Sequence, residues 1–190
     1  MKMKNFKVQN MRFTRFILSV LSLLALPLAA HAESSNLIHE MKIGVLHHDM
    51  DNLWSNYKRE SGVDGNMELI FNAEVPLWGG EVRPAVGASI NSVGDTSKFY
   101  AAARWETTIG ENGLFAIGVG AAMHNGDTSL VRTDKKTLGS QVLFYFPIEA
   151  GYRLNERDTV SVFFDHVSNA WLATPNEGMD TLGIRYGMRF

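Results

Sequence analysis

Hydrophobic and polar residues alternate in steps of two along most of the chain. The clearest case is the segment 66–75, whose apolar face carries Met67, Leu69, Phe71, Ala73 and Val75. A period of two is typical of a β-strand with different surroundings on its two faces. Similar segments recur at 39–48, 82–90, 99–109, 115–123, 142–148, 160–168 and 180–190. The pattern therefore predicts an all-β protein with eight strands.

The connections between these segments alternate in length. The long or polar ones are 50–65, 93–97, 125–138 and 169–179, and the short ones are 77–80, 110–113 and 153–158. Outer-membrane barrels have an even number of antiparallel strands, with short turns at one end and longer loops at the other. The sequence thus predicts an eight-stranded antiparallel transmembrane β-barrel.

The opposite face of the strands carries charges of both signs. Eight strands enclose a space that side chains can fill, so we expect a packed polar interior and no pore. A soluble sandwich or lipocalin-like barrel is the alternative, with the apolar face turned inward. The Phe-rich apolar face and the terminal Phe190 favour the membrane. Pro84 and Pro147 fit strands poorly, and we expect both near the short-turn rim, where a lost ladder bond is tolerated.

The N-terminus has the order of a secretory signal peptide. Five basic residues precede an apolar run at 16–28, and Ala30-His31-Ala32 resembles a cleavage site. The run is shorter than the ~20 residues of a spanning helix, which argues against an uncleaved anchor. We expect residues 1–32 to be removed, leaving residues 33–190 as a single barrel exported to the outer membrane.

Charge and cysteine content exclude some functions. The chain has 18 basic and 20 acidic residues, and removing the five basic residues of the leader leaves 13 against 20, a net charge of −7. A nucleic acid is therefore not expected as a partner, since it would require a basic patch. Without cysteine, neither a disulfide framework nor a thiolate metal site can form.

Candidate chemistry gathers where the last two strands meet. His166 and Ser168 share the apolar face of one strand, and Asp180 begins the next. We therefore expect all three to point out of the barrel at its long-loop end, toward the lipid of the outer leaflet. Positions i and i+2 are ~6.6 Å apart, and opposed residues of antiparallel strands are ~5 Å apart at Cβ. A base, a nucleophile and an orienting acid thus lie within reach, as acyl transfer requires. The alternative is a polar rim at the headgroups, where charges cost only ~0–1 kcal/mol.

Three elements of this region resemble one family. They are His166-Val167-Ser168-Asn169-Ala170, Pro175-Asn176-Glu177-Gly178, and Asp180 at the start of a last strand that ends in Phe190. Together they resemble the PagL family of lipid A 3-O-deacylases, which are eight-stranded outer-membrane barrels. The resemblance is specific over about 28 residues.

The resemblance implies a carboxylic ester hydrolase that removes the 3-hydroxyacyl chain from the 3 position of lipid A in lipopolysaccharide. It implies that Ser168 is the nucleophile and His166 the base. The acid follows the His by fourteen positions, which is Asp180, where the best-known members have Glu. No cofactor or metal is needed for this chemistry. Asn169, Asn176 or backbone amides of the loop 169–178 are candidates for the oxyanion hole.

Other polar residues allow weaker hypotheses. His47, His48 and Asp49 suggest a metal site, but adjacent residues of a strand face opposite sides, so a rim or loop-anchoring role is preferred. Lys58 and Arg59 are either solvated or placed to meet lipid A phosphates. The tryptophans fall at strand ends or in loops, as in aromatic girdles, and one of them, Trp171, is placed to line an acyl groove.

Two rival functions remain at this stage. The first is a structural or binding barrel of the outer membrane whose triad is inactive. The second is a soluble periplasmic carrier of the lipocalin type. The sequence does not decide between a monomer and a homodimer.

Overall fold

The computed structural model describes residues 37–56 and 58–190, so the expected signal peptide lies outside the described residues. The strands in chain order are β1 (Ile38–His47), β2 (Val63–Phe71), β3 (Val75–Leu77), β4 (Gly80–Asn91), β5 (Lys98–Ile109), β6 (Gly113–His124), β7 (Val142–Arg153), β8 (Asp158–Ser168) and β9 (Met179–Arg189). Among the described residues, no helix is long and apolar enough to cross a membrane.

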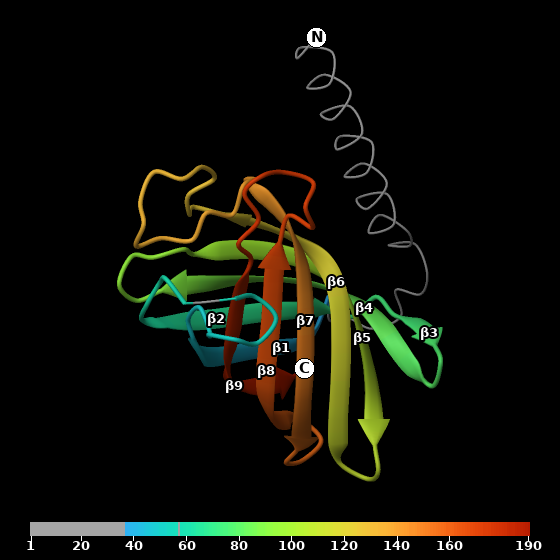
Figure 1. The fold of residues 1–190 in the computed structure, drawn as a ribbon. Coiled ribbons are helices and arrows are strands. Elements are labelled where there is room, and N and C mark those ends of the chain that lie inside the picture. Colours follow the sequence, from blue (N-terminus) through green and yellow to red (C-terminus); the bar gives the residue numbers. More distant parts are fainter. Residues whose placement is uncertain (1–36, 57) are drawn as a thin grey trace.

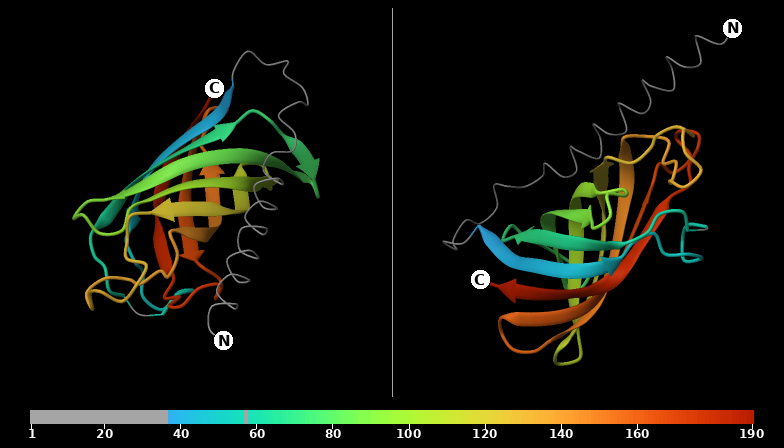
Figure 2. Two further views of the ribbon diagram at one scale, coloured as in Figure 1. Left: turned by 90° about the horizontal axis from the view of Figure 1, so that it is seen from above. Right: turned by 90° about the vertical axis from the view of Figure 1, so that its left-hand side faces the viewer.

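The eight long strands form a closed antiparallel barrel. Each pairs with its neighbours in the chain, β1 also pairs with β9, and β2 pairs with β4. Figure 2 shows the first strand, in blue, beside the last, in red, where the sheet closes. The predicted fold class is therefore confirmed.

The short strand β3 continues the predicted strand 66–75 after an interruption. Ile70 pairs with Ala85 and Val75 pairs with Val82, so five steps along one strand face three along the other. Two extra residues therefore leave the ladder, one more than in an ordinary β-bulge. Arg83 holds this bulge through a hydrogen bond of 3.3 Å to Asn72 and an ion pair with Glu74.

Long loops and short turns separate to opposite ends of the barrel, as predicted. The connections 48–62, 92–97, 125–141 and 169–178 lie at one end, and 78–79, 110–112 and 154–157 lie at the other. In Figure 1 the β5–β6 and β7–β8 turns lie at the bottom, and the loops after β6 and β8 lie at the top. All four long loops can therefore contact one another.

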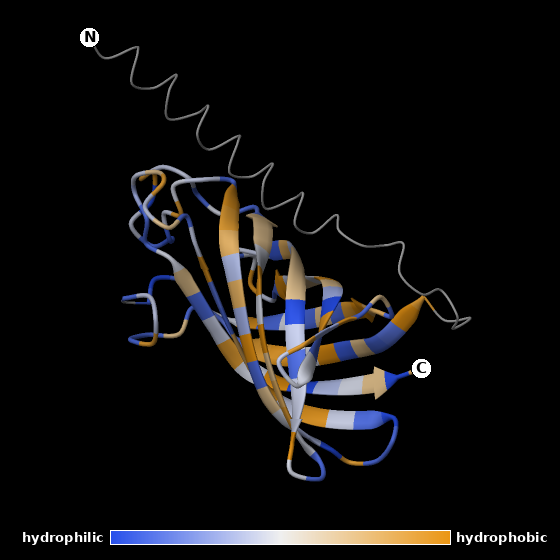
Figure 3. Ribbon diagram, turned by 90° about the vertical axis from the view of Figure 1, so that its right-hand side faces the viewer, coloured by the Kyte–Doolittle hydropathy of each residue, from blue (hydrophilic) through white to orange (hydrophobic). Residues whose placement is uncertain are grey.

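The outer wall of the barrel is apolar. Figure 3 shows the alternation as bands of orange and blue along the strands. The exposed apolar side chains of the strands include Ile43, Val45, Met67, Ile90, Phe99, Val119, Met123, Val162 and Ile184. In a soluble protein, single exposed residues of this kind are ordinary, but a continuous apolar surface marks contact with a membrane or a partner.

The interior is packed with paired charges. Glu149 accepts a hydrogen bond of 3.1 Å from Lys42 and forms ion pairs with Arg104 at 2.6 Å and with Arg185. Arg185 also lies 3.2 Å from Glu68, and all five residues are buried. A charge in such a place is tolerated only when it is paired. The predicted polar core is confirmed.

Pro147 lies in the middle of β7, opposite Asp165 of β8, so its predicted place near the short-turn rim is wrong. The neighbouring strand β6 makes room for it at Gly118, where a Cβ would lie 2.8 Å from Cγ of Pro147. Pro84 follows the prediction, four residues after the start of β4. A strand can therefore accommodate a proline in two ways. The proline can lie near the rim, as Pro84 does, or it can lie beside a glycine of the next strand, as Pro147 does.

Candidate active site

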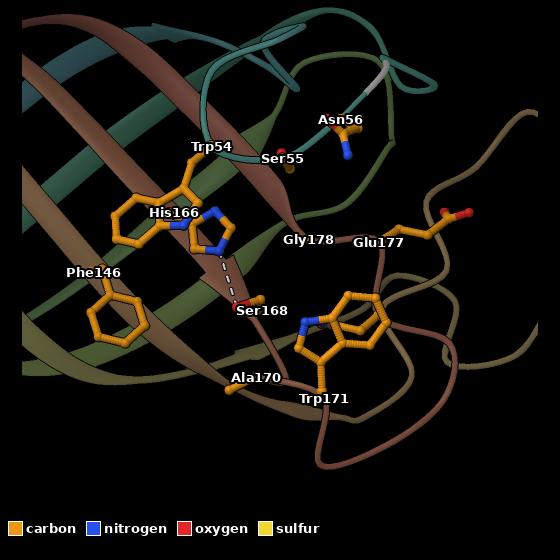
Figure 4. Close-up of a pocket in the computed structure, with 11 residues that line it drawn as sticks. Trp54, Ser55, Asn56, Phe146, His166, Ser168, Ala170, Trp171, Glu177 and Gly178 are labelled. Atoms are coloured by element: carbon orange, nitrogen blue, oxygen red, sulfur yellow. Dashed lines mark hydrogen bonds between the residues drawn. The ribbon is translucent and has the colours of Figure 1, made fainter.

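The folded chain brings His166, Ser168 and Asp180 together. His166 and Ser168 point to the same side of β8, and Asp180 is the direct partner of His166 on β9. His166 Nε2 lies 3.0 Å from Ser168 Oγ, and Nδ1 lies 2.6 Å from Asp180 Oδ1. Figure 4 shows the contact between His166 and Ser168 as a dashed line. The imidazole thus bridges a hydroxyl and a carboxylate through its two nitrogens.

The second oxygen of Asp180 binds the first long loop. Its Oδ2 accepts hydrogen bonds of 2.6 Å from the backbone N–H of Trp54 and of Ser55. The backbone carbonyl of Asp180 accepts another, of 2.8 Å, from Met50. The carboxylate is therefore oriented by the loop as well as by the strand, which fixes the oxygen that faces His166.

The three side chains lie on the outer wall but are not open to the surroundings. The exposed fractions are 5% for His166, 8% for Ser168 and 0% for Asp180. Strand parity does place them outside, on the face of Val162, as predicted. They are covered because the indole of Trp54 stacks on the imidazole, with ring centroids 4.6 Å apart and planes 12° apart. Sequence reasoning assigned Trp54 only to an aromatic girdle.

A cavity of about 390 Å³ opens beside Ser168. Its lining mixes polar and aromatic side chains: Trp54, Ser55, Asn56, Phe146, His166, Ser168, Trp171, Asn176 and Glu177. As predicted, Trp171 lies where it can line a groove, and Figure 4 shows it across the cavity from His166. Such a lining suits an amphipathic ligand with both a polar part and an apolar chain.

The loop 169–178 shapes the cavity wall. Asn169 is buried, and its Nδ2 donates to the carbonyls of Leu138 at 3.0 Å and Pro175 at 2.8 Å. Its backbone N–H donates to Oδ1 of Asn176 at 3.0 Å. The side-chain donors of Asn169 are thus occupied, and of the two predicted asparagines only Asn176 lines the cavity. Sequence reasoning could not separate them, because both stand in one loop.

His47 and His48 point to opposite sides, as expected for neighbours in an extended chain. His48 is buried, with Nδ1 3.0 Å from Asp64 and Nε2 3.0 Å from Glu60. His47 Nε2 lies 3.5 Å from Nζ of Lys58 on the other side. No group of three or more His, Cys, Asp or Glu residues in the described part of the chain is arranged to hold a metal ion.

Glu60 joins three of the long loops. Its carboxylate accepts hydrogen bonds from the backbone N–H of Thr96 at 2.9 Å and of Lys136 at 3.0 Å, besides its contact with His48. Burial alone would raise the pKa of Glu60, but these hydrogen bonds lower it to about 2. Burial would likewise lower the pKa of His48, but hydrogen bonds to Asp64 and Glu60 raise it above 6.5. The loop-anchoring interpretation of His48 fits this cluster.

Arg59 lies in the same assembly of loops. Its Nη1 donates to the carbonyl of Thr133 at 2.7 Å, and its Nη2 lies 3.2 Å from Glu177 at the cavity. The guanidinium therefore connects the first, third and fourth long loops. These contacts indicate that Arg59 has a structural role in holding the loops together and is not a freely solvated charge.

The fold and the site together define a class: an eight-stranded barrel with an apolar outer wall that carries a Ser-His-Asp cluster under a loop. Within that class the family is shown by the sequence, since the profile described as lipid A 3-O-deacylase (PagL) matches residues 43–189. The chain belongs to this family. Family and barrel fold together imply an outer-membrane protein with lipid A as the substrate of the family.

A solved structure shows a similar fold. The crystal structure of the outer membrane enzyme PagL aligns with 80% of this chain and 99% of its own, with a TM-score of 0.56 and 20% identity. The outer membrane protein Ail of Yersinia pestis covers 80% of this chain and 99% of its own, with a TM-score of 0.46 and 13% identity. No curated protein matches the sequence.

Proposed function

We propose that this protein is a serine esterase that removes the ester-linked 3-hydroxyacyl chain from the 3 position of lipid A. The observation that carries the proposal is the imidazole of His166, hydrogen-bonded on one side to Ser168 and on the other to Asp180. Membership of the lipid A 3-O-deacylase family supports lipid A as the substrate.

In this mechanism Ser168 Oγ attacks the ester carbonyl while Nε2 of His166 takes the hydroxyl proton. Asp180 holds the tautomer in which Nδ1 carries the hydrogen and stabilises the imidazolium that forms. Collapse of the tetrahedral intermediate breaks the ester C–O bond, and the imidazolium gives its proton to the departing 3-oxygen of the sugar, which leaves as a free hydroxyl. Water then hydrolyses the acyl-enzyme by the same steps, with His166 again as base.

The negative charge on the carbonyl oxygen needs hydrogen-bond donors, which usually supply a large part of the rate. Asn176 lines the cavity and is the side-chain candidate. Backbone N–H groups at Ala170 and Trp171 are the other candidates, because both residues have positive φ, of 50° and 62°. Such a conformation is costly for residues other than glycine and is concentrated at functional sites.

The position of the cavity suits a membrane lipid as substrate. It lies at the long-loop end of the outer wall, above the apolar side chains Val162 and Ile148 of β8 and β7. An acyl chain can follow this wall while the sugar stays near the loops. A cluster inside the barrel could not receive such a lipid, since buried charged and apolar side chains pack the interior.

The rival proposal is a structural barrel with an inactive triad. Mass spectrometry of lipid A from cells with and without the gene separates the two. Active enzyme removes one hydroxyacyl chain, cells carrying Ser168→Ala keep it, and the matched variant Ser129→Ala, changed in an exposed loop residue, behaves as wild type. Unchanged lipid A in the presence of correctly folded wild-type protein would support the structural barrel.

A further inference from the structure

We propose that Trp54 is a positioning residue of the reaction, which stabilises the positively charged form of His166. This inference rests on the proposed function. The indole lies nearly parallel to the imidazole, at a centroid distance of 4.6 Å and an interplanar angle of 12°. It comes from the loop between β1 and β2, while the imidazole belongs to β8.

The indole is fixed both by its backbone and by its ring. Its backbone N–H donates to Oδ2 of Asp180, the carboxylate whose other oxygen faces His166. Its ring also stacks against Phe146 at 5.7 Å and Phe164 at 6.4 Å. Burial alone does not explain this placement, because 55% of Trp54 remains exposed. Of its three ring contacts, the one with His166 has the shortest centroid distance.

The imidazole has little freedom to leave the stack. Gly178 lies beside it, so that a Cβ on this glycine would be 3.1 Å from Cε1 of His166. The hydrogen bonds to Ser168 and Asp180 fix the ring in its own plane. When it takes the proton of Ser168 it becomes a cation over the face of an indole.

A cation over the face of tryptophan is attracted by the negative charge of the π-system, and the attraction grows when water is excluded. His166 is 5% exposed, so solvent screens this attraction weakly. The contact is stronger for the imidazolium than for the neutral ring, and an interaction that strengthens toward the transition state increases the rate.

The activation of Ser168 can be measured without lipid A by using an alkyl fluorophosphonate. Ser168 Oγ forms a bond to phosphorus, the P–F bond breaks, fluoride leaves, and the hydroxyl proton passes to His166. Trp54→Leu should lower the second-order rate of labelling about tenfold, which corresponds to ~1.4 kcal/mol. Trp54→Phe, which keeps an aromatic face, should lose only about threefold. Leu53→Ala, changed at an exposed neighbour in the same loop, should label at the wild-type rate.

The pH dependence of labelling separates this effect from a disturbed loop. When the imidazolium loses its stabilisation, the acid limb of the rate profile should move to lower pH, by up to about one unit for a tenfold effect. A disturbed loop would lower the rate at every pH and leave the limb in place. Equal rates in wild type and Trp54→Leu, or a lowered rate with an unmoved limb, would overturn the inference.

The outcome for wild type tests the proposed function separately. Wild-type protein that is labelled at Ser168 but leaves lipid A intact contradicts the proposed substrate and still allows the comparison of the Trp54 variants. Wild-type protein that is folded and not labelled contradicts the proposed function and the inference together.

Discussion

Oδ1 of Asp180 lies 2.6 Å from Nδ1 of His166, and the two residues are direct partners in the antiparallel pair of β8 and β9. The short Asp side chain reaches the imidazole because the strands place the two Cβ atoms opposite each other. Its other oxygen is held by two backbone N–H groups of the first long loop. The carboxylate of Asp180 therefore contacts both the first long loop, which covers the site, and His166, the proposed base.

This geometry predicts that Asp180→Glu is harmful although it restores the acid expected for the family. The extra methylene must enter a space closed by Trp54 and Ser55, and overpacking of this kind costs ~1–3 kcal/mol. We expect at least a tenfold lower kcat/KM for acyl release. Asp180→Asn, which cannot hold the required tautomer, should lose about 10³–10⁴ in kcat. Full activity of Asp180→Glu would show that the loop does not confine the carboxylate.

Gly178→Ala should lower both stability and activity. Gly178 has φ +61°, and its new Cβ would approach Cε1 of His166 to 3.1 Å. Gly94→Ala is a matched control, because its φ is +84° but no atom lies within 4 Å of its Cβ. The strain of ~1–2 kcal/mol should appear in the thermal unfolding of both variants, while only Gly178→Ala should lose esterase activity. Activity lost to the same extent in both would contradict a contact with the imidazole.

The cluster of His48 and Glu60 predicts loops that are held best at moderately acidic pH. The pKa of His48 is raised, so its stabilisation is complete below pH 6.5 and is lost as the pH rises through the raised value. The pKa of Glu60 is lowered to about 2, so its contribution is complete above pH 4.5 and is lost on acidification toward pH 2. Amide hydrogen exchange at Thr96 and Lys136, corrected for its intrinsic pH dependence, should be slowest between these limits.

The matched control for this measurement is His48→Gln, which offers hydrogen bonds but does not titrate. In this variant the amides of Thr96 and Lys136 should exchange faster than in wild type near pH 5. Their corrected exchange rates should not increase further as the pH rises. The facing groups Asp64 and Lys98 are the same in both proteins. Wild-type exchange that stays constant from pH 6 to pH 9 would be inconsistent with a protonated His48 between two carboxylates.

The interior predicts a large cost for removing Glu149. Glu149→Ala leaves the buried cations Lys42, Arg104 and Arg185 without their shared partner, and breaking a buried pair costs ~3–5 kcal/mol. Glu81→Ala removes a half-exposed partner of Arg83 and should cost ~0–1 kcal/mol. Urea unfolding of the barrel in detergent measures both. If both variants lost the same free energy of unfolding, the charges of the interior would have to be screened by water.

The sequence predicts the barrel and the three central residues because both depend on strand periodicity. Parity places His166 and Ser168 on one face, and antiparallel pairing brings Asp180 beside them. The cover provided by Trp54 is not predicted, since it depends on a loop that binds a carboxylate 126 positions away. Such a contact leaves no periodic signal.

The same reasoning applies to His48 and Pro147. His48 contacts Glu60, in a loop, and Asp64, on the next strand. The spacing of these residues in the sequence does not predict that they meet. Pro147 is accommodated by Gly118 on the neighbouring strand, and only the register of the sheet reveals that relation. Strand pattern thus specifies which face a residue occupies, whereas loop conformation and register specify what it touches.

The most direct test of the central claim uses purified protein in detergent with lipid A of defined structure. Tandem mass spectrometry identifies the position from which an acyl chain is lost. Wild-type protein should release one 3-hydroxy fatty acid from the 3 position, and Ser168→Ala and His166→Ala should release none above background. Release by folded Ser168→Ala at the wild-type rate, or loss of a chain from another position, would contradict the account.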